Sequence, residues 1–538
     1  MGAAGIHSVE LLFLLLLVFV AALAAMAKRF QVPYPIVLVV GGLILSLFPR
    51  GPHIELNPNI VFLIVLPPLV FSAAFVTSWQ MFRQNFVSIM MLAFGLVGFT
   101  VFGIAAASRW ILPGFDWRMG LVLGAVVSTT DAIAATSIAK RVGLPKPVTD
   151  ILEAESLVND ASGLLALEFT TALLVTGRSP GILGGAADLA YLVAGSTVIG
   201  LAIGKAIDFF ETKINDAPIE ITMTLAAPFL AYLAAESARA SGVLATVVCG
   251  LYLGQKSSLY FSRAARLTGR AVWDTLTFIL NGFVFILIGF QLPYILEGIR
   301  TLSIGRLLAL GMLFSVVVIL LRIVWVFPGA WISNFIRSRF LRQPMALPDR
   351  RQVFIVGWTG MRGVVALAAA ISLPVALGDG SAFPQRNVMI FLAFCVIFVT
   401  LVLQGLTLPG LIRALGLCGA PAKDPEEAPA RRAIIEAAVA FLEDRRDDDD
   451  GQFAVVYDDL LRFQRRRLNT IESNNSAEIG YRPEDYARWR ELSREIRALQ
   501  RASLLNLRNH NEISDEVMRK LEHEIDLMDA GFSSADKI

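Results

Sequence analysis

Residues 155–165 read ESLVNDASGLL and lead into the apolar run LALEFTTALLV at 165–175. Together the two stretches are long enough for a membrane span, which needs about 20 mostly apolar residues. Yet they include Glu155 and Asp160, and a charge in the middle of such a helix costs about 2.5–3.5 kcal/mol. The acids therefore indicate that this helix faces a cavity or a buried partner.

The composition of the whole chain supports a membrane protein. Of its 538 residues 55% are hydrophobic and the mean hydropathy is +0.63, which is too apolar for one soluble core. Residues 417–538 differ, because they hold 19 Lys and Arg and 26 Asp and Glu. We therefore predict an all-α transmembrane domain at 1–416 and a helical cytoplasmic domain at 417–538. The few cysteines and histidines show no disulfide or metal spacing, so no cofactor is expected.

Glycine, proline and charge clusters divide residues 1–416 into apolar segments. They predict thirteen transmembrane helices, at 9–27, 33–48, 58–78, 85–108, 118–139, 147–176, 181–204, 218–236, 241–255, 271–292, 303–329, 352–377 and 386–415. Lys28 and Arg29 follow the first apolar run, which is the reverse of a signal peptide. We therefore expect a multi-pass cell-membrane protein with its N-terminus outside and its C-terminus in the cytoplasm, an orientation that the Lys and Arg bias of the loops favours.

The charged tail contains two stretches with apolar residues at three- and four-residue spacing, at 431–446 and 484–508. This spacing predicts helices. The sequence RRR at 465–467 fits either contact with anionic lipid head groups or a solvated helix face. No catalytic or nucleic-acid-binding module is visible, so we expect the tail to regulate the membrane domain through a partner that the sequence does not identify.

The fifth predicted helix has a polar middle, GAVVSTTDAIAATSI at 124–138. Ser and Thr compete with backbone hydrogen bonding, and irregular backbone inside a membrane is tolerated only where it lines a cavity. Broken helices of this kind bring backbone dipoles to a bound ion. A Ser- and Thr-rich packing helix is the alternative, and Asp131 favours the functional interpretation.

The sixth predicted helix contains the opening stretch. Ser156 and Asp160 are four residues apart and share one helix face, so a hydroxyl and a carboxylate point to one place. Hard monovalent cations take oxygen ligands, and one carboxylate holds either a cation or a proton. That competition is the chemistry of an exchanger.

The twelfth predicted helix, GWTGMRGVVALAAAISLP at 357–374, supplies a positive charge, Arg362, between Gly360 and Gly363. A buried Arg must be paired. We expect Glu155 to be its partner in a structural ion pair.

At these residues the sequence resembles the monovalent cation–proton antiporters of the Na+/H+ exchanger type, in the NhaP-like bacterial branch with Asn-Asp in the sixth helix. The resemblance rests on LPPLVF (66–71), STTDAIAAT (128–136), EAESLVNDASGL (153–164), APFLAYLAAE (227–236), GWTGMRGVVALA (357–368) and VLQGLTLPGLIR (402–413). It implies thirteen helices in inverted repeats, broken helices crossing at the ion site, and a homodimer with a core that moves as an elevator.

The resemblance also implies roles for single residues. Asp160 would bind the cation or proton, with Ser156 and Thr130 as further oxygen ligands of Na+. Asn159 stands where the electrogenic branch has a second Asp, which implies electroneutral one-for-one exchange. In the supporting roles, Asp131 would steady the crossing and Glu155 would pair with Arg362. Such a protein would maintain pH and sodium balance.

Two positions depart from the family pattern. Ala132 follows Thr130-Asp131 where the family has proline, and Ser72 stands where many members have an acid. The departure at Ser72 leaves open whether Na+, Li+ or K+ is preferred, so a K+/H+ antiporter is the alternative. The sequence GRSPG at 177–181 fits a serine-hydrolase motif, but a loop between membrane helices is the wrong context for it.

Overall fold

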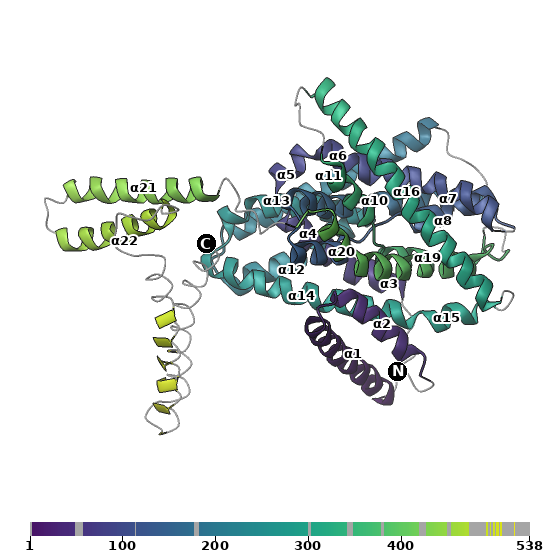
Figure 1. Ribbon diagram of the computed structural model, residues 1–538, viewed down its shortest axis with the longest axis horizontal. Coiled ribbons are helices and arrows are strands. Elements are labelled where there is room, and N and C mark those ends of the chain that lie inside the picture. Colours follow the sequence, from purple (N-terminus) through teal and green to yellow (C-terminus); the bar gives the residue numbers. More distant parts are fainter. Residues whose placement is uncertain are drawn as a thin grey trace. The chain divides into compact units, whose positions relative to one another are not determined.

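The protein is described by a computed structural model, which is helical throughout most of its length (Figure 1). It describes residues 3–48, 57–112, 114–176, 182–299, 303–341, 348–377, 381–418, 427–448, 453–472 and scattered positions within 491–521. The chain divides into two compact units, Met1–Pro421 and Ala422–Ile538. The GRSPG sequence lies outside the described residues.

One helix, or two or three helical segments in succession, occupies each of the thirteen predicted ranges. Within the described residues, eight helical stretches are long and apolar enough to cross a membrane: Pro58–Val76, Phe86–Ile111, Lys146–Val175, Ala187–Glu211, Ala217–Ser237, Ala264–Glu297, Ile304–Arg339 and Arg386–Ala414. This result confirms the prediction of an all-helical protein with several helices that can cross a membrane. Thirteen spans and inverted repeats stay predictions.

One set of helices in the first unit, here called the α13 set, packs around α13. Helix α13 lies against α4, α11 and α12, while α14 lies against α2 and α12. Figure 1 shows α1, α2 and α14 together at one edge. The members are α1 (Ala3–Arg29), α2 (Tyr34–Ser46), α3 (Pro58–Ile60), the π-helical η1 (Val61–Val65), α4 (Leu66–Val76), α11 (Ile182–Glu211), α12 (Ala217–Ser237), α13 (Gly242–Tyr260), α14 (Arg263–Phe290) and α15 (Leu292–Glu297).

The other set, here called the α10 set, packs around α10. Helix α10 lies against α8 and α9, α7 lies against α8, and α16 lies against α7, α17 and α19. Its members are α5 (Trp79–Gln84), α6 (Phe86–Met90), η2 (Met91–Leu96), α7 (Val97–Ile111), α8 (Trp117–Val126), α9 (Ala132–Val142), α10 (Lys146–Thr176), α16 (Ile304–Arg339), α17 (Arg350–Trp358), α18 (Val364–Ile371), α19 (Arg386–Val399), η3 (Thr400–Gln404) and α20 (Gly405–Ala414). Helix α10 also touches α4 and α13, so the two sets share a boundary.

Several helices are longer than predicted, and α14 and α16 are two examples. Helix α14 starts at Arg263, where the hydroxyl of Ser262 accepts a hydrogen bond from the Ala265 N–H at 3.1 Å. Helix α16 continues through Pro328 to Arg339. The extra residues of both helices include arginines, which a hydropathy pattern places outside the apolar segment.

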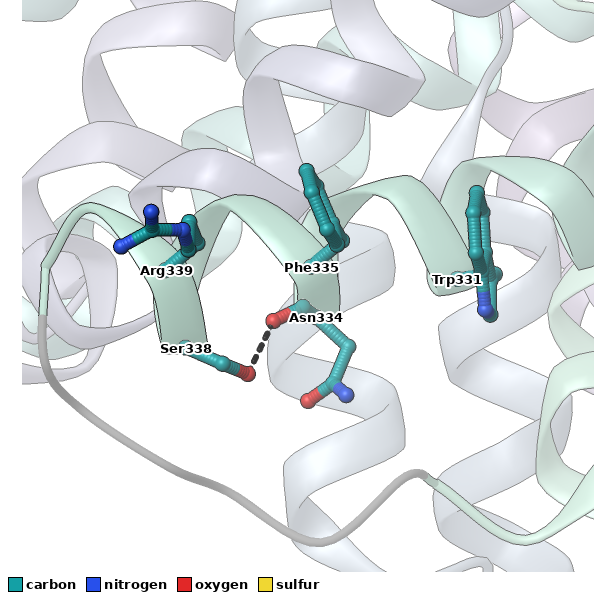
Figure 2. Close-up of a pocket in the computed structure, with 5 residues that line it drawn as sticks. All are labelled: Trp331, Asn334, Phe335, Ser338 and Arg339. Atoms are coloured by element: carbon teal, nitrogen blue, oxygen red, sulfur yellow. Dashed lines mark hydrogen bonds between the residues drawn. The ribbon is translucent and has the colours of Figure 1, made fainter.

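A surface pocket lies along the last turns of α16, and all of its lining side chains project from that helix (Figure 2): Trp331, Asn334, Phe335, Ser338 and Arg339. The Trp331 and Phe335 rings stack with centroids 5.9 Å apart. Aromatic and Arg side chains at the end of a long apolar helix are typical of a membrane–water interface. None of the predicted ion-site residues lines this pocket.

The second unit contains α21 (Glu427–Asp448) and α22 (Ala454–Glu472), which pack on each other. Two ion pairs link them, Arg465–Glu443 at 2.6 Å and Arg446–Asp458 at 3.2 Å. The predicted helix at 431–446 lies within α21, whereas most of the predicted helix at 484–508 lies outside the described residues.

Candidate ion-binding site

Two interrupted helices meet inside the α10 set. Helix α8 ends at Val126 and α9 begins at Ala132, and helix α17 ends at Trp358 and α18 begins at Val364. The backbone N–H of Asp131 donates to the carbonyl oxygen of Met361 at 2.8 Å, so the two breaks touch. We call this contact the crossing. It leaves non-helical backbone in the protein interior, which is tolerated in a membrane only where protein or a cavity surrounds it.

The first break forms without proline. The carboxylate of Asp131 accepts a hydrogen bond from the Ile133 N–H at 2.8 Å and so caps α9. This cap satisfies one of the backbone donors that a helix start leaves free. Ala132, where the family pattern has proline, is the first residue of α9.

The second break needs glycine where it faces Asp131. A Cβ atom on Gly363 would overlap the Asp131 carboxylate, and a Cβ on Gly360 would overlap the Arg322 side chain. These glycines therefore allow the backbone of the second break to lie close to the Asp131 and Arg322 side chains, which any larger residue would prevent.

Ser156 on α10 ties its own helix to the first break. Its hydroxyl donates to the Thr130 carbonyl oxygen at 2.9 Å and accepts from the Ala132 N–H at 3.4 Å. Both hydrogen bonds go to main-chain atoms on either side of Asp131. The two residues predicted as ligands, Ser156 and Thr130, are thus in contact, and the Ser156 hydroxyl stabilises the first break.

The partner of Glu155 is Arg322 on α16, and the predicted pairing with Arg362 is wrong. The Arg322 Nη1 and Nη2 atoms donate to Glu155 Oε1 and Oε2 at 2.6 and 2.8 Å, and both side chains are 1% exposed. The Thr130 hydroxyl donates to Glu155 Oε1 at 3.4 Å. A two-point pair of this kind satisfies both charges in the interior, where a single unpaired charge is costly.

Arg362 instead binds main-chain oxygens at the crossing. Its Nε donates to the Val127 carbonyl at 3.0 Å, and its Nη1 donates to the Gly360 carbonyl. Its backbone N–H donates to the Thr400 hydroxyl at 3.2 Å. Val127 is the C-cap residue of α8, and the carbonyl end of a helix carries a partial negative charge that a cation stabilises. The positive charge of Arg362 is therefore placed on the helix end.

Asn159 and Asp160 have no protein hydrogen bond for their side chains within the described residues. Asn159 is fully buried, and both its amide oxygen and nitrogen lack a partner. Asp160 is only partly buried, and its charge interacts with that of Asp131. Buried polar groups are nearly always hydrogen-bonded, so these atoms are available to water or an ion.

Other charges that stand out in the sequence lie outside this cluster. Glu168 is exposed on α10, and Glu236 on α12 accepts a hydrogen bond from the Gly242 N–H at 3.4 Å. Ser72 is a partly buried residue of α4 in the α13 set. Arg322 also lies in an apolar segment of the sequence, the predicted helix at 303–329, but nothing in the sequence indicates its partner.

A sequence model of the family described as "Sodium/hydrogen exchanger, transmembrane" matches residues 14–414. The chain is 30% identical to the Na(+)/H(+) exchanger YjcE of Escherichia coli (strain K12), over 96% of this chain and 98% of that protein. It is also 30% identical to a protein of Bacillus pumilus named "Sodium, potassium, lithium and rubidium/H(+) antiporter", over 86% of this chain and 70% of that protein.

The fold resembles a solved structure, that of the sodium proton antiporter MjNhaP1 from Methanocaldococcus jannaschii. The TM-score is 0.60 at 20% sequence identity, over 77% of this chain and 100% of that one. The all-helical architecture is therefore shared even where the sequences have diverged.

Proposed function

Because the chain belongs to the sodium/hydrogen exchanger family, it is a transporter and not an enzyme, and we propose that it exchanges one Na+ for one H+ at Asp160. Asp160 is the ionisable side chain at the crossing that has no protein partner within the described residues. A carboxylate without a fixed partner is free to bind a proton and a cation in turn. The proposal rests on this observation, that the Asp160 side chain has no protein partner within the described residues.

The charges around the crossing support electroneutral exchange. Glu155 and Arg322 form an ion pair, while Arg362 and Asp131 place one positive and one negative charge on the two breaks. When these four groups and Asp160 are all ionised, their net charge is one negative charge. One Na+ or one H+ balances it, so the loaded site has the same net charge in both cases.

The remaining residues have proposed supporting roles. The hydroxyl of Thr130 and the amide oxygen of Asn159 are proposed as further oxygen ligands of the cation, and Ser156 holds the break in place. Asp131 caps α9, while the Glu155–Arg322 pair joins α10 to α16. The main-chain bonds of the crossing support a transport core that moves as one body in an elevator-type alternating-access cycle.

The cellular setting is also proposed. We infer a homodimer in the cell membrane with an external N-terminus, a cytoplasmic C-terminus and a regulatory tail, serving pH and sodium balance. A K+/H+ antiporter is the second candidate, because Ser72 removes an acid that many family members have. The name of the Bacillus pumilus relative includes both sodium and potassium, so it is compatible with either candidate.

Exchange in proteoliposomes tests the proposal. Acid-loaded vesicles with the purified full-length chain should lose their pH gradient on addition of Na+, and Asp160→Asn vesicles should keep it. Glu153→Gln is the matched control, since Glu153 lies on the same helix in an outer pair with Lys140 at 2.6 Å. Exchange by Asp160→Asn at the wild-type rate would refute the mechanism.

The same vesicles decide the cation and the stoichiometry. Equal concentrations of Na+, Li+ and K+ are compared, and a faster response to K+ selects the second candidate. A membrane potential imposed across the vesicles should leave the rate unchanged. A rate that follows the potential would contradict one-for-one exchange.

A further inference from the structure

The pocket on the last turns of α16, here called the α16 pocket, lies at the depth of lipid head groups. Helix α16 is long and apolar enough to cross a membrane, and its last turn contains Arg337 and Arg339. The pocket is formed by five residues of these turns (Figure 2): Trp331, Asn334, Phe335, Ser338 and Arg339. Aromatic rings and arginines at the end of a membrane helix mark the boundary between hydrocarbon and water.

An apolar stripe on α16 leads to the pocket. Its members are exposed and recur at three- or four-residue spacing, so they share one face of the helix: Val316, Leu320, Val324, Phe327, Trp331 and Phe335. From Val324 to Phe335 this α16 stripe measures about 16 Å along the helix axis. The hydrocarbon core of a bilayer is about 30 Å thick, so the acyl chain of a single leaflet matches this length.

The other side of the same turns is fixed to the α10 set. The Ser333 hydroxyl lies 2.8 Å from the hydroxyl of Ser88 on α6. Arg337 donates from Nη2 to the carbonyl oxygen of Gln84, the last residue of α5, at 2.7 Å. Ser333 and Arg337 are buried, whereas Trp331, Phe335 and Arg339 are exposed. The α16 pocket and the α16 stripe therefore face the surroundings of the protein.

Three hydrogen-bond donors of the pocket have no partner within the described residues. They are the indole N–H of Trp331, the side-chain amide of Asn334 and the guanidinium of Arg339. The Ser338 hydroxyl already donates to the Asn334 carbonyl oxygen at 2.6 Å. Donors grouped around one positive charge suit the oxygens of a phosphate, which accept several charge-assisted hydrogen bonds at once.

The described helices around this end of α16 supply no acid to pair with Arg339. Helix α16 contains no Asp or Glu, and neither do α5, α6 and α17. Residues 337–351 include five arginines and one acid, Asp349, whose carboxylate caps α17 by accepting from the Arg351 N–H at 3.0 Å. This end of the protein is therefore complementary to an anion, and the anions of a membrane surface are lipid head groups.

Two other occupants fit less well. In a two-fold dimer the same patch faces itself, so a second copy brings two Arg339 side chains together without an acid between them. A quaternary ammonium head group needs open aromatic faces. The Trp331 and Phe335 rings instead stack on each other, with their planes 19° apart, so one face of each ring is already covered.

We propose that the α16 pocket binds the head group of an anionic phospholipid. The phosphate accepts hydrogen bonds from Arg339, Asn334 and Trp331, and one acyl chain lies along the α16 stripe from Phe335 to Val324. In the orientation proposed above this lipid belongs to the cytoplasmic leaflet. The site is distinct from Asp160, and it attaches the lipid to the α10 set.

Native mass spectrometry of the full-length chain tests the site without requiring transport. The protein is freed of lipid in detergent and titrated with phosphatidylglycerol or with phosphatidylcholine of the same acyl chains. The first phosphatidylglycerol should bind more tightly than the first phosphatidylcholine. Arg339→Gln should weaken it about tenfold, because a hydrogen bond to a charged group is lost. Asn334→Ala should also weaken it, although the charge of the protein is unchanged.

Arg306→Gln is the matched control, because Arg306 is an exposed arginine in the first turn of the same helix. It should leave the affinity for phosphatidylglycerol unchanged. Equal weakening by Arg306→Gln and Arg339→Gln would overturn the proposal, since it reduces the effect to general surface attraction. Wild-type affinity in both Arg339→Gln and Asn334→Ala would also refute it.

The same spectra report the oligomeric state. If Arg339→Gln changes the proportion of dimers and leaves lipid binding as it was, the patch belongs to a second copy and the lipid proposal fails. All of these results are separate from whether the chain exchanges Na+ for H+, which the vesicle assay measures.

Discussion

Arg322 and Glu155 lie 167 positions apart in the sequence and form a two-point ion pair at 2.6 and 2.8 Å with both side chains buried. Arg322 also donates from Nε to the Val356 carbonyl at 3.1 Å. The Arg322 guanidinium therefore connects its own helix, α16, to both α10 and α17. The geometry assigns this pair a structural role, and that role is open to direct measurement.

Removing one member of the pair should lower the stability of the folded protein. We expect Arg322→Met to lower the free energy of unfolding by about 3–5 kcal/mol, because Glu155 is left buried with an uncompensated charge. Adding Glu155→Gln to that variant should restore part of the loss. Thermal unfolding in detergent measures both. The outer pair is the control: Lys140→Ala, in which Lys140 is 64% exposed, should cost at most about 1 kcal/mol. Equal losses in the two variants would contradict the structural role.

Asn159 should contribute more to ion binding than to the stability of the fold. Its amide makes no protein hydrogen bond within the described residues, so Asn159→Ala removes a ligand for ion or water. We expect the KM for Na+ to rise about fivefold, which corresponds to one hydrogen bond of about 1 kcal/mol. Ser162→Ala is the control, because Ser162 donates to the Ala93 carbonyl at 2.5 Å and supports packing. That variant should lose stability at unchanged KM, and the reverse pattern would argue against an ion contact at Asn159.

Gly363 should not tolerate a methyl group. The added Cβ of Gly363→Ala would overlap the Asp131 carboxylate, so we expect a loss of about 1–3 kcal/mol in stability together with slower exchange. Gly98→Ala on α7 is the matched control, because nothing lies within 4 Å of its added Cβ. Unfolding curves and vesicle exchange are compared for the two. Similar behaviour of both variants would mean that the breaks do not approach so closely.

Ala132 should accept the family's proline. It is the first residue of α9, where proline is favoured, and Asp131 before it has the extended backbone that proline requires. Ala132→Pro loses the 3.4 Å bond from its N–H to Ser156, so we expect a change in stability of no more than about 1 kcal/mol and continued exchange. Ala139→Pro, inside the same helix, should cost about 3 kcal/mol. Inactivity of Ala132→Pro would show that the bond to Ser156 is essential.

The sequence predicted where the unusual helices lie, because polar residues in apolar runs are rare enough to stand out. Ser128 to Asp131 indicated a break, and the break is there. The partner of Glu155 was not predictable in the same way. Two arginines, Arg322 and Arg362, lie in apolar segments, and the choice between them depends on how distant helices are rotated about their axes.

Glu211 and Glu220 illustrate a second limit of the sequence. Both stand near helix ends, where acids normally contact water, so their pattern gives no reason to single them out. Only the packing of α11 and α12 with their neighbours shows that the two side chains are buried. Ser72, by contrast, was visible as a departure, and its effect on ion choice remains a prediction.

Main-chain atoms accept most of the bonds at the crossing, and this has a consequence for mutational tolerance. Met361 and Val127 contribute carbonyl oxygens, which every residue type possesses. Arg362 and Ser156 contribute the side chains that bind such oxygens. In a saturation library, positions 127 and 361 should therefore accept many apolar substitutions of similar size, while positions 156 and 362 should accept few. The architecture of the break is thus carried by a small number of side chains, and the rest of its sequence is free to vary.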